Sequence, residues 1–355
     1  MKAIISSLNF SPGHLSHTIA YAKLFREIGY DVFLWLHKEY KRMIKDIEFP
    51  IIWYPEESIG NTDIILFVNV STINHKYAQI LKRKGSKVIY LYHEPWESFR
   101  QYLKEGIKQA LKATIAHFFS VRLLKNSDLV IVPSKYALNL YKNKDIKYNE
   151  NVLMIPLLFD DELDEEVDIT KKQYFSYIGH AVKGHAFDVY IELIKHIYKQ
   201  GVDMKFQIAT RTDLSRLLKK DKILQEMIEK EILKIAHGRP LPNSEINRAY
   251  KESFCIWNVY RRSTQSGVLP KAFMFGTPVI TSKVGSFPEY VMNGKNGFIL
   301  ETKNISDYRY LLTLIHEVQN KLARMSLNAR ETFKRTFWYK AYVAKVKNLL
   351  AKITS

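Results

Sequence analysis

The sequence of 355 residues contains a single cysteine, Cys255. An intramolecular disulfide is therefore excluded, and no cysteine or histidine residues stand at the spacing of a zinc site. No apolar run reaches the roughly 18 residues that a membrane-spanning helix needs. Residues 1–10 turn polar after Ile5, so we interpret them as a first buried strand and not as a signal peptide. These absences predict a cytoplasmic protein without a metal centre.

The chain also has no low-complexity segment and no repeat of 20–50 residues. It carries 54 Lys and Arg against 36 Asp and Glu, a formal net charge of +18. Such an excess of positive charge indicates a polyanionic partner: nucleic acid, an anionic membrane or a phosphorylated substrate. The alternative is that the lysines only solvate exposed faces of the protein. No nucleic-acid-binding motif accompanies the charge, so we expect no nucleic acid.

The first half of the chain alternates strand and helix patterns. Strands are predicted over 3–8, 31–36, 63–70, 87–92 and 128–132, and helices over 16–28 and 97–125. Gly29 follows the first helix in the position of a left-handed C-cap. This order predicts a parallel, doubly wound α/β sheet.

The alternation restarts after an acidic stretch at 160–166, which we interpret as a solvated linker between domains. Strands are predicted over 174–178, 204–209, 254–259, 278–281 and 297–300, and helices over 187–199, 214–235 and from 306 onward, with a break at 337–338. The predicted domains are 1–160 and 173–336, joined by a linker over 161–172 and followed by a terminal helix over 337–355.

Ligands of such sheets bind beyond the carboxyl ends of the strands, so the residues after each strand are the candidates. Gly13 follows the first strand, where it lets the backbone approach a ligand next to a helix N-terminus. His93, beside Glu94, follows the strand over 87–92 and is placed to hold a sugar hydroxyl. The structural alternative for Gly13 is an ordinary loop in which Ser16 caps the following helix. The alternative for His93 is a histidine near the core whose hydrogen bonds are satisfied by the protein.

Two loops of the second half carry phosphate-binding features. Lys183 lies between glycines in the strand-to-helix turn over 179–185, a suitable place for a phosphate. Residues 260–267 contain two arginines, hydroxyl side chains and a glycine, and they open an apolar helix. The alternative for Lys183 is a surface lysine in a flexible turn.

Five motifs in order give the chain a resemblance to the retaining family 4 (group 1) glycosyltransferases. The motifs are Pro12-Gly13-x-x-x-His17, His93-Glu94-Pro95, Asp128 to Ser134, Tyr177-Ile178-Gly179 with Lys183-Gly184, and the series Gly276-x-Pro278-Val279-Ile280, Gly285-x-x-Pro288-Glu289 and Asn293-Gly294-x-Asn296-Gly297-Phe298. Together they span nearly the whole chain.

The resemblance implies the GT-B fold, in which two Rossmann-like domains face a cleft. Residues 1–160 would form the acceptor side and 173–336 the nucleotide-sugar donor domain, and the helix over 337–355 would cross back to pack on the first domain. The reaction implied is transfer of a sugar from a nucleotide-diphosphate donor with retention of anomeric configuration, and no metal or other cofactor is obligatory.

The resemblance also implies roles for particular residues. Gly13 would approach the donor diphosphate, and His93 would contact the donor sugar near the reacting carbon, which makes these two the candidate catalytic residues. The candidate donor-binding residues are Gly179, His180, Lys183, Arg262, Ser263, Gln265, Ser266, Gly267, Val268 and Lys271.

Three positions depart from the family pattern. Ser263 and Lys271 stand where the family usually carries two glutamates, and His180 stands where it carries an arginine. We expect the Lys271 ammonium to reach the phosphates or the ribose in place of a glutamate; the alternative is a solvated helix residue. A degenerate, non-catalytic GT-B partner subunit is the alternative function. A sugar-nucleotide epimerase would need a further carboxylate pair that is not found.

The predicted helix over 97–125 is basic and amphipathic. Arg100, Lys104, Lys108 and Lys112 recur every four residues, next to Leu103, Ile107, Leu111, Ile115, Phe118 and Phe119. A helix of this kind can lie on an anionic bilayer. We therefore expect a peripheral protein at the inner face of the cell membrane, acting on a glycan or lipid-linked acceptor in cell-surface polysaccharide synthesis. The alternative is that the apolar side packs on the sheet.

Overall fold

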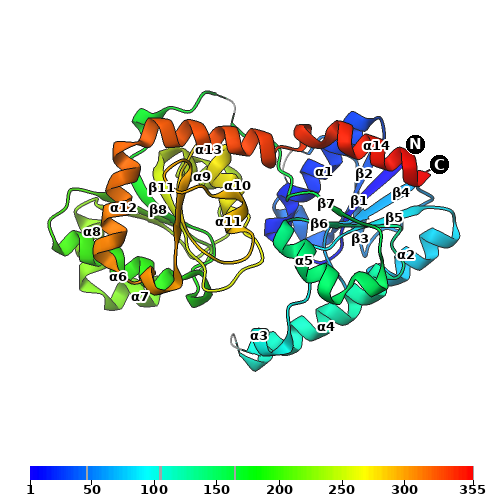
Figure 1. The fold of residues 1–355 in the computed structure, drawn as a ribbon, viewed down its shortest axis with the longest axis horizontal. Coiled ribbons are helices and arrows are strands. Elements are labelled where there is room, and N and C mark those ends of the chain that lie inside the picture. Colours follow the sequence, from blue (N-terminus) through cyan, green and yellow to red (C-terminus); the bar gives the residue numbers. More distant parts are fainter. Residues whose placement is uncertain (45–46, 104–105, 164, 355) are drawn as a thin grey trace. The chain divides into compact units, whose positions relative to one another are not determined.

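The computed structural model describes residues 1–44, 47–103, 106–163 and 165–354, and it divides into two compact units (Figure 1). The first unit comprises Met1–Asp160 and Thr336–Ser355, and the second comprises Asp161–Arg335. Each unit is a parallel β-sheet with helices packed on it, the arrangement that βα alternation predicts.

The first unit contains a seven-stranded sheet in the order β3-β2-β1-β4-β5-β6-β7. Its strands are β1 (Lys2–Ser7), β2 (Asp31–His37), β3 (Ile51–Tyr54), β4 (Ile64–Phe67), β5 (Lys87–Leu91), β6 (Leu129–Val132) and β7 (Val152–Met154). Its helices are α1 (Leu15–Ile28), α2 (Asn74–Arg83), α3 (Phe99–Leu103), α4 (Ile107–Leu124), α5 (Lys135–Lys144) and α14 (Val343–Thr354). The inner strands are almost fully buried, as apolar runs covered on both faces require.

The second unit contains a six-stranded sheet in the order β10-β9-β8-β11-β12-β13. Its strands are β8 (Tyr174–Ile178), β9 (Lys205–Ala209), β10 (Leu233–Ala236), β11 (Ser253–Asn258), β12 (Val279–Ser282) and β13 (Gly297–Leu300). Its helices are α6 (Phe187–Lys199), α7 (Ser215–Lys220), α8 (Lys222–Glu229), α9 (Asn243–Glu252), α10 (Val268–Met274), α11 (Phe287–Tyr290), α12 (Tyr308–Asn320) and α13 (Leu322–Thr336).

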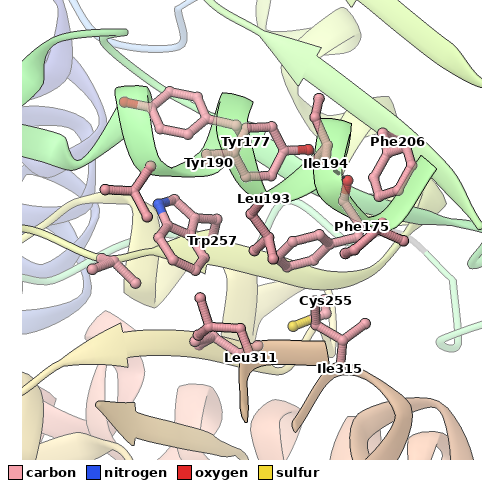
Figure 2. Packing of buried hydrophobic residues seen from close by; sticks show 14 of the residues in the cluster. Phe175, Tyr177, Tyr190, Leu193, Ile194, Phe206, Cys255, Trp257, Leu311 and Ile315 are labelled. Atoms are coloured by element: carbon pink, nitrogen blue, oxygen red, sulfur yellow. Dashed lines mark hydrogen bonds between the residues drawn. The ribbon is translucent and has the colours of Figure 1, made fainter. Parts of the chain in front are cut away.

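An aromatic core packs α6 on the sheet of the second unit (Figure 2). The Tyr190 hydroxyl on α6 donates to the carbonyl oxygens of Phe175 (2.8 Å) and Gln207 (3.1 Å), on neighbouring strands. Trp257 Nε1 on β11 donates to the Ala186 carbonyl at 3.3 Å, just before α6. Because buried polar groups need partners, these bonds fix α6 against β8, β9 and β11.

The predicted elements with clean periodicity are confirmed. The segments over 174–178, 187–199 and 297–300 coincide with β8, α6 and β13. Gly29 ends α1 in the left-handed conformation, at φ 108°. The break at 337–338 is confirmed as well, and α14 packs in the core of the first unit through Val346 and Leu350.

Two predicted helices were wrong in extent. The helix over 97–125 is α3 followed by α4, since Gly106 adopts φ 110°, a non-helical angle that glycine tolerates. The segment over 214–235 is α7, α8 and β10, because the Asp221 side chain accepts from the amides of Ile223 and Leu224 and starts a new helix. Helix α1 begins at Leu15, so Ser16 lies inside it and is not its cap.

The acidic stretch is not simply a solvated linker. Asp161 forms a two-pronged ion pair with Arg330 at 2.7 and 2.6 Å, and both side chains are largely buried. Glu162 is half-buried and accepts hydrogen bonds from Lys271 and Asn247. These carboxylates therefore tie the start of the second unit to its own helices.

Candidate active site

In the first unit, the segments that follow β1 and β5 bring three histidines together, His17 of α1 among them. The ring centroids of His14 and His93 lie 4.9 Å apart, and those of His17 and His93 lie 5.8 Å apart. His17 Nδ1 lies 3.0 Å from the Leu158 carbonyl oxygen, which orients that ring. His93, predicted from its strand-end position, thus lies in a cluster with His17 and with His14, which was not among the predicted site residues.

Burial favours the neutral form of His14 and His93. It lowers the pKa of His14 to about 4 and holds the pKa of His93 well below its usual value, and the neighbouring histidines add to the effect on His93. A neutral imidazole offers one donor and one acceptor nitrogen and no charge. The cluster is suited to hydrogen bonding or proton transfer and not to binding a phosphate by charge.

Gly13 lies next to this cluster, in the 3₁₀ turn Pro12–His14. The residue is exposed, and a Cβ built on it would meet nothing within 4 Å. The fold itself therefore does not require glycine at this position.

The neutral state of His14 predicts acid sensitivity. The unfolded chain binds the proton below pH 6.5 and the folded protein only near pH 4, so the free energy of unfolding falls as the pH drops between these values. By pH 5 the loss from this group should be about 2 kcal/mol. Urea unfolding at pH 7.5 and pH 5 should show a smaller loss for His14→Gln than for wild type. His316→Gln, at an exposed position on α12, is the matched control and should behave like wild type. Equal losses in wild type and His14→Gln would contradict the interpretation.

In the second unit, the β8–α6 turn and the β11–α10 loop lie against each other. Gly179 has φ 132°, and a Cβ there would lie 3.4 Å from Val268 Cγ2. The Arg261 amide donates to the Gly184 carbonyl at 2.8 Å, and its guanidinium binds the Asp188 carboxylate at 2.8 and 2.9 Å and donates to the Lys183 carbonyl. Arg261, one of the two arginines of the loop over 260–267, is therefore already paired with Asp188, whose pKa it lowers.

A stacked pair of aromatic rings joins the β8–α6 turn to the start of the β11–α10 loop. The rings of His185 and Tyr260 stack at 4.0 Å with planes 7° apart, and the Tyr260 and Ser266 hydroxyls lie 2.9 Å apart. The buried Ser266 hydroxyl also accepts from the Val268 amide at 3.1 Å. Ser266 thus shapes the start of α10, and Gly267, before it, is exposed.

The remainder of the loop rests on the turn after β12. The Ser286 amide donates to the Thr264 carbonyl at 3.1 Å, and the Ser263 hydroxyl donates to the Gln265 carbonyl. Gly285 has φ 53°, and a Cβ there would come within 2.1 Å of the Ser263 carbonyl oxygen. Arg262, Ser263 and Gln265 are half-buried in this loop.

The charged candidates differ in exposure. Lys183 and His180 are exposed in the β8–α6 turn, and the His180 carbonyl accepts from the Tyr177 hydroxyl at 2.7 Å. The Lys271 side chain is only 9% exposed, and its Nζ lies 3.1 Å from Glu162 Oε2. The alternative of a solvated Lys271 is therefore wrong.

One supporting residue carried no signal in the sequence. Lys172 is buried, and its Nζ donates to the carbonyl oxygens of Ser253 (3.2 Å) and Phe275 (3.0 Å) and to the Thr277 hydroxyl (2.8 Å). Burial lowers its pKa to about 7. Lys172 links the start of β11 to the turn between α10 and β12, so it holds the frame of the loop over 260–267.

The described residues contain no group of three histidine, cysteine or acidic side chains arranged to hold a metal ion. The groups available for chemistry are therefore neutral imidazoles in the first unit and, in the second unit, an amide-rich turn that carries a lysine.

Two Rossmann-like units of this topology give the chain the GT-B fold that solved glycosyltransferases share. Residues 159–332 match the family described as glycosyl transferases group 1. An uncharacterized glycosyltransferase from Methanocaldococcus jannaschii is 24% identical over 333 residues, which cover 91% of this chain and 81% of the relative.

Solved structures share the fold over the full length. HepE from Anabaena, crystallised with UDP, has a TM-score of 0.71 at 15% identity and covers 99% of this chain and 100% of its own. Sucrose-phosphate synthase from Thermosynechococcus elongatus has a TM-score of 0.72 at 14% identity, with 99% of both chains covered. WaaG, a glycosyltransferase of lipopolysaccharide biosynthesis, has a TM-score of 0.64 at 13% identity, covering 98% of this chain and 99% of its own.

Proposed function

We propose that the enzyme transfers a sugar from a nucleotide-diphosphate sugar to a glycan or lipid-linked acceptor, with retention of configuration. The proposed process is cell-surface polysaccharide synthesis, and the proposed location is the cytoplasmic face of the membrane. Similar proteins support the donor class, since HepE was crystallised with UDP-glucose and the pneumococcal transferase GtfA with UDP and N-acetylglucosamine. WaaG, by its role in lipopolysaccharide synthesis, supports the class of acceptor.

The observation that carries the donor proposal is the joined pair of turns in the second unit. Arg261 binds the carbonyl groups of the β8–α6 turn and pairs with Asp188, which leaves the exposed Lys183 as a positive charge on a fixed backbone. Lysine at a strand-to-helix turn, beside free amides, binds a phosphate as a point charge. We propose that the donor diphosphate lies against this turn and the adjoining Ser266–Gly267 turn.

A non-catalytic partner subunit is the second candidate. It rests on Ser263 and Lys271, which stand where the family usually carries glutamates. Lys271 nevertheless forms a charged pair with Glu162, so a carboxylate is present beside that position from another segment of the same unit. We propose that this pair takes over part of the role of the missing glutamate.

A panel of nucleotide sugars tests the proposal, with Lys183→Ala as the central variant. Wild type should slowly hydrolyse one donor of the panel and bind the matching nucleoside diphosphate. Lys183→Ala should weaken that binding by about 1–3 kcal/mol, the scale of one charged hydrogen bond, as measured by calorimetry.

Lys199→Ala, at an exposed position at the end of α6, is the matched control and should bind like wild type. Unchanged affinity in Lys183→Ala would refute the phosphate role of this lysine. Nucleotide binding without hydrolysis or transfer of any donor would favour the non-catalytic partner.

A further inference from the structure

Helix α4 presents an apolar face that the first unit does not cover. Ile107, Leu111, Ile115 and Phe118 are 64%, 53%, 59% and 51% exposed. They stand at positions i, i+4, i+8 and i+11, which share one side of a helix. Single exposed apolar side chains are ordinary, but a continuous row of four is a feature of interaction surfaces.

The opposite side of α4 is the one that packs. Ala110, Ser120, Leu123 and Leu124 are its buried residues. Figure 1 shows α3 and the first turns of α4 extending beyond the sheet of the first unit, and α3 adds Phe99 and Leu103, which are also exposed. The alternative that the apolar row packs on the sheet is therefore wrong.

The charged side chains within helices α3 and α4 are all basic. Helices α3 and α4 contain no acidic residue, while Arg100, Lys108, Lys112 and Arg122 are exposed. Lys108 and Lys112 each follow a residue of the row, so they lie about 100° further round the helix, on its flank. The Arg122 guanidinium lies 3.8 Å from the centre of the Phe118 ring. The expected residue Lys104 lies outside the described residues, and the division into α3 and α4 interrupts the predicted continuous basic stripe.

This combination selects among the possible occupants. A second copy of the chain would bring its own basic flank against the first, and the two sets of like charges would repel each other. An anionic bilayer accepts both features, because its interior takes the apolar row and its headgroups take the lysines and arginines. No helix among the described residues has the length and hydropathy to cross a membrane, so the contact must be peripheral.

We propose that α4 lies in the headgroup region of an anionic bilayer, with Ile107, Leu111, Ile115 and Phe118 directed into the acyl chains and Lys108 and Lys112 at the lipid phosphates. The inference rests on the proposed function, because a lipid-linked acceptor would be held in a membrane. It gives that acceptor a route, since α3 and α4 directly follow the loop that carries His93.

Flotation with vesicles measures the contact. Wild type should bind vesicles of phosphatidylcholine and phosphatidylglycerol at low salt and bind neutral phosphatidylcholine vesicles far more weakly. Leu111→Gln with Ile115→Gln should weaken partition about ten-fold or more, because two exposed apolar side chains no longer leave water. Lys108→Gln with Lys112→Gln should weaken it about five-fold per residue, and added salt should produce a similar loss.

Matched controls separate this surface from general stickiness. Ile80→Gln with Leu327→Gln changes two exposed apolar residues elsewhere, and Lys219→Gln with Lys220→Gln changes two exposed lysines on α7. Both control variants should bind vesicles like wild type. Failure of wild type to bind at low salt, equal binding by the α4 variants, or a dimer that Leu111→Gln with Ile115→Gln dissolves would overturn the proposal.

A fluorescent label reports insertion directly. Cys255 is fully buried, so Ile115→Cys provides the accessible thiol for an environment-sensitive dye. Its emission should shift to the blue on anionic vesicles, whereas the same dye on Leu327→Cys should not shift. Calorimetry with the nucleoside diphosphate, in the absence of lipid, should give wild-type affinity for every α4 variant. If the wild type binds no nucleoside diphosphate, the proposed function is contradicted, whereas the vesicle result is unaffected.

Discussion

His93→Ala should lower turnover by about 10²- to 10⁴-fold, the range that a group engaged in the chemical step contributes. Its affinity for the nucleoside diphosphate should stay within about three-fold of wild type. This split is expected because the donor phosphates are proposed to bind the second unit, and His93 belongs to the first. A change confined to turnover identifies an interaction made in the transition state.

The environment of His93 supports a chemical role over simple packing. The ring lies at the carboxyl end of β5, between His14 and His17, and burial holds its pKa well below the usual value. A neutral imidazole can hydrogen-bond a sugar hydroxyl through either nitrogen, according to its tautomer. Truncation to alanine removes that group and leaves the strand end in place.

Stability must be measured beside turnover, since an alanine in a buried cluster also leaves a cavity. His196→Ala, which truncates a half-buried histidine on α6 in the second unit, is the matched control and should retain turnover. His93→Gln should recover part of the activity if hydrogen bonding is the role. Near-normal turnover in His93→Ala would mean that the histidine is structural.

The strand ends were predictable because of a local contrast. A buried apolar run followed at once by polar residues and glycine indicates a strand that ends at a ligand edge, and both His93 and Lys183 stand at such points. The fold class followed from the alternation of these runs with helical periodicity. Edge strands β3 and β7 were missed because they are only four and three residues long.

The partners of the site residues were not predictable. Arg261 pairs with Asp188, 73 residues away, and Lys172 donates to the carbonyl of Phe275, 103 residues away. No spacing rule relates positions so far apart in the chain, since the fold alone brings them together. The interruption of the helix over 97–125 had a visible signal in Gly106, which intrinsic propensity disfavours in a helix interior.

The reason for Gly285 is likewise tertiary. The sequence places it in a glycine-bearing motif, but only the structure shows what an added Cβ would meet. It would come within 2.1 Å of the Ser263 carbonyl oxygen and 2.7 Å of the Thr264 carbonyl oxygen, both of them backbone atoms. Real Cβ contacts are never so short, so the chain must move.

Gly285→Ala should therefore abolish most donor binding, with a loss of at least about 100-fold in nucleoside-diphosphate affinity. Its φ of 53° alone makes alanine cost about 1–2 kcal/mol, and the clash adds to this by pushing the loop over 262–265 off its support. The hydrogen bond from the Ser286 amide to the Thr264 carbonyl would break in the same movement. Arg262, Ser263 and Gln265 would leave their positions together.

Gly294→Ala is the matched control for this effect. Gly294 also has a positive φ, 71°, but a Cβ there meets only the Glu317 carboxylate oxygen, at 4.0 Å. This variant should lose about 1 kcal/mol of stability from backbone strain and bind the nucleotide like wild type. Comparing the two variants by calorimetry and by thermal unfolding separates the cost of a left-handed alanine from displacement of the loop. Wild-type affinity in Gly285→Ala would show that residues 262–265 do not contact the donor, and the phosphate site would then rest on the β8–α6 turn alone.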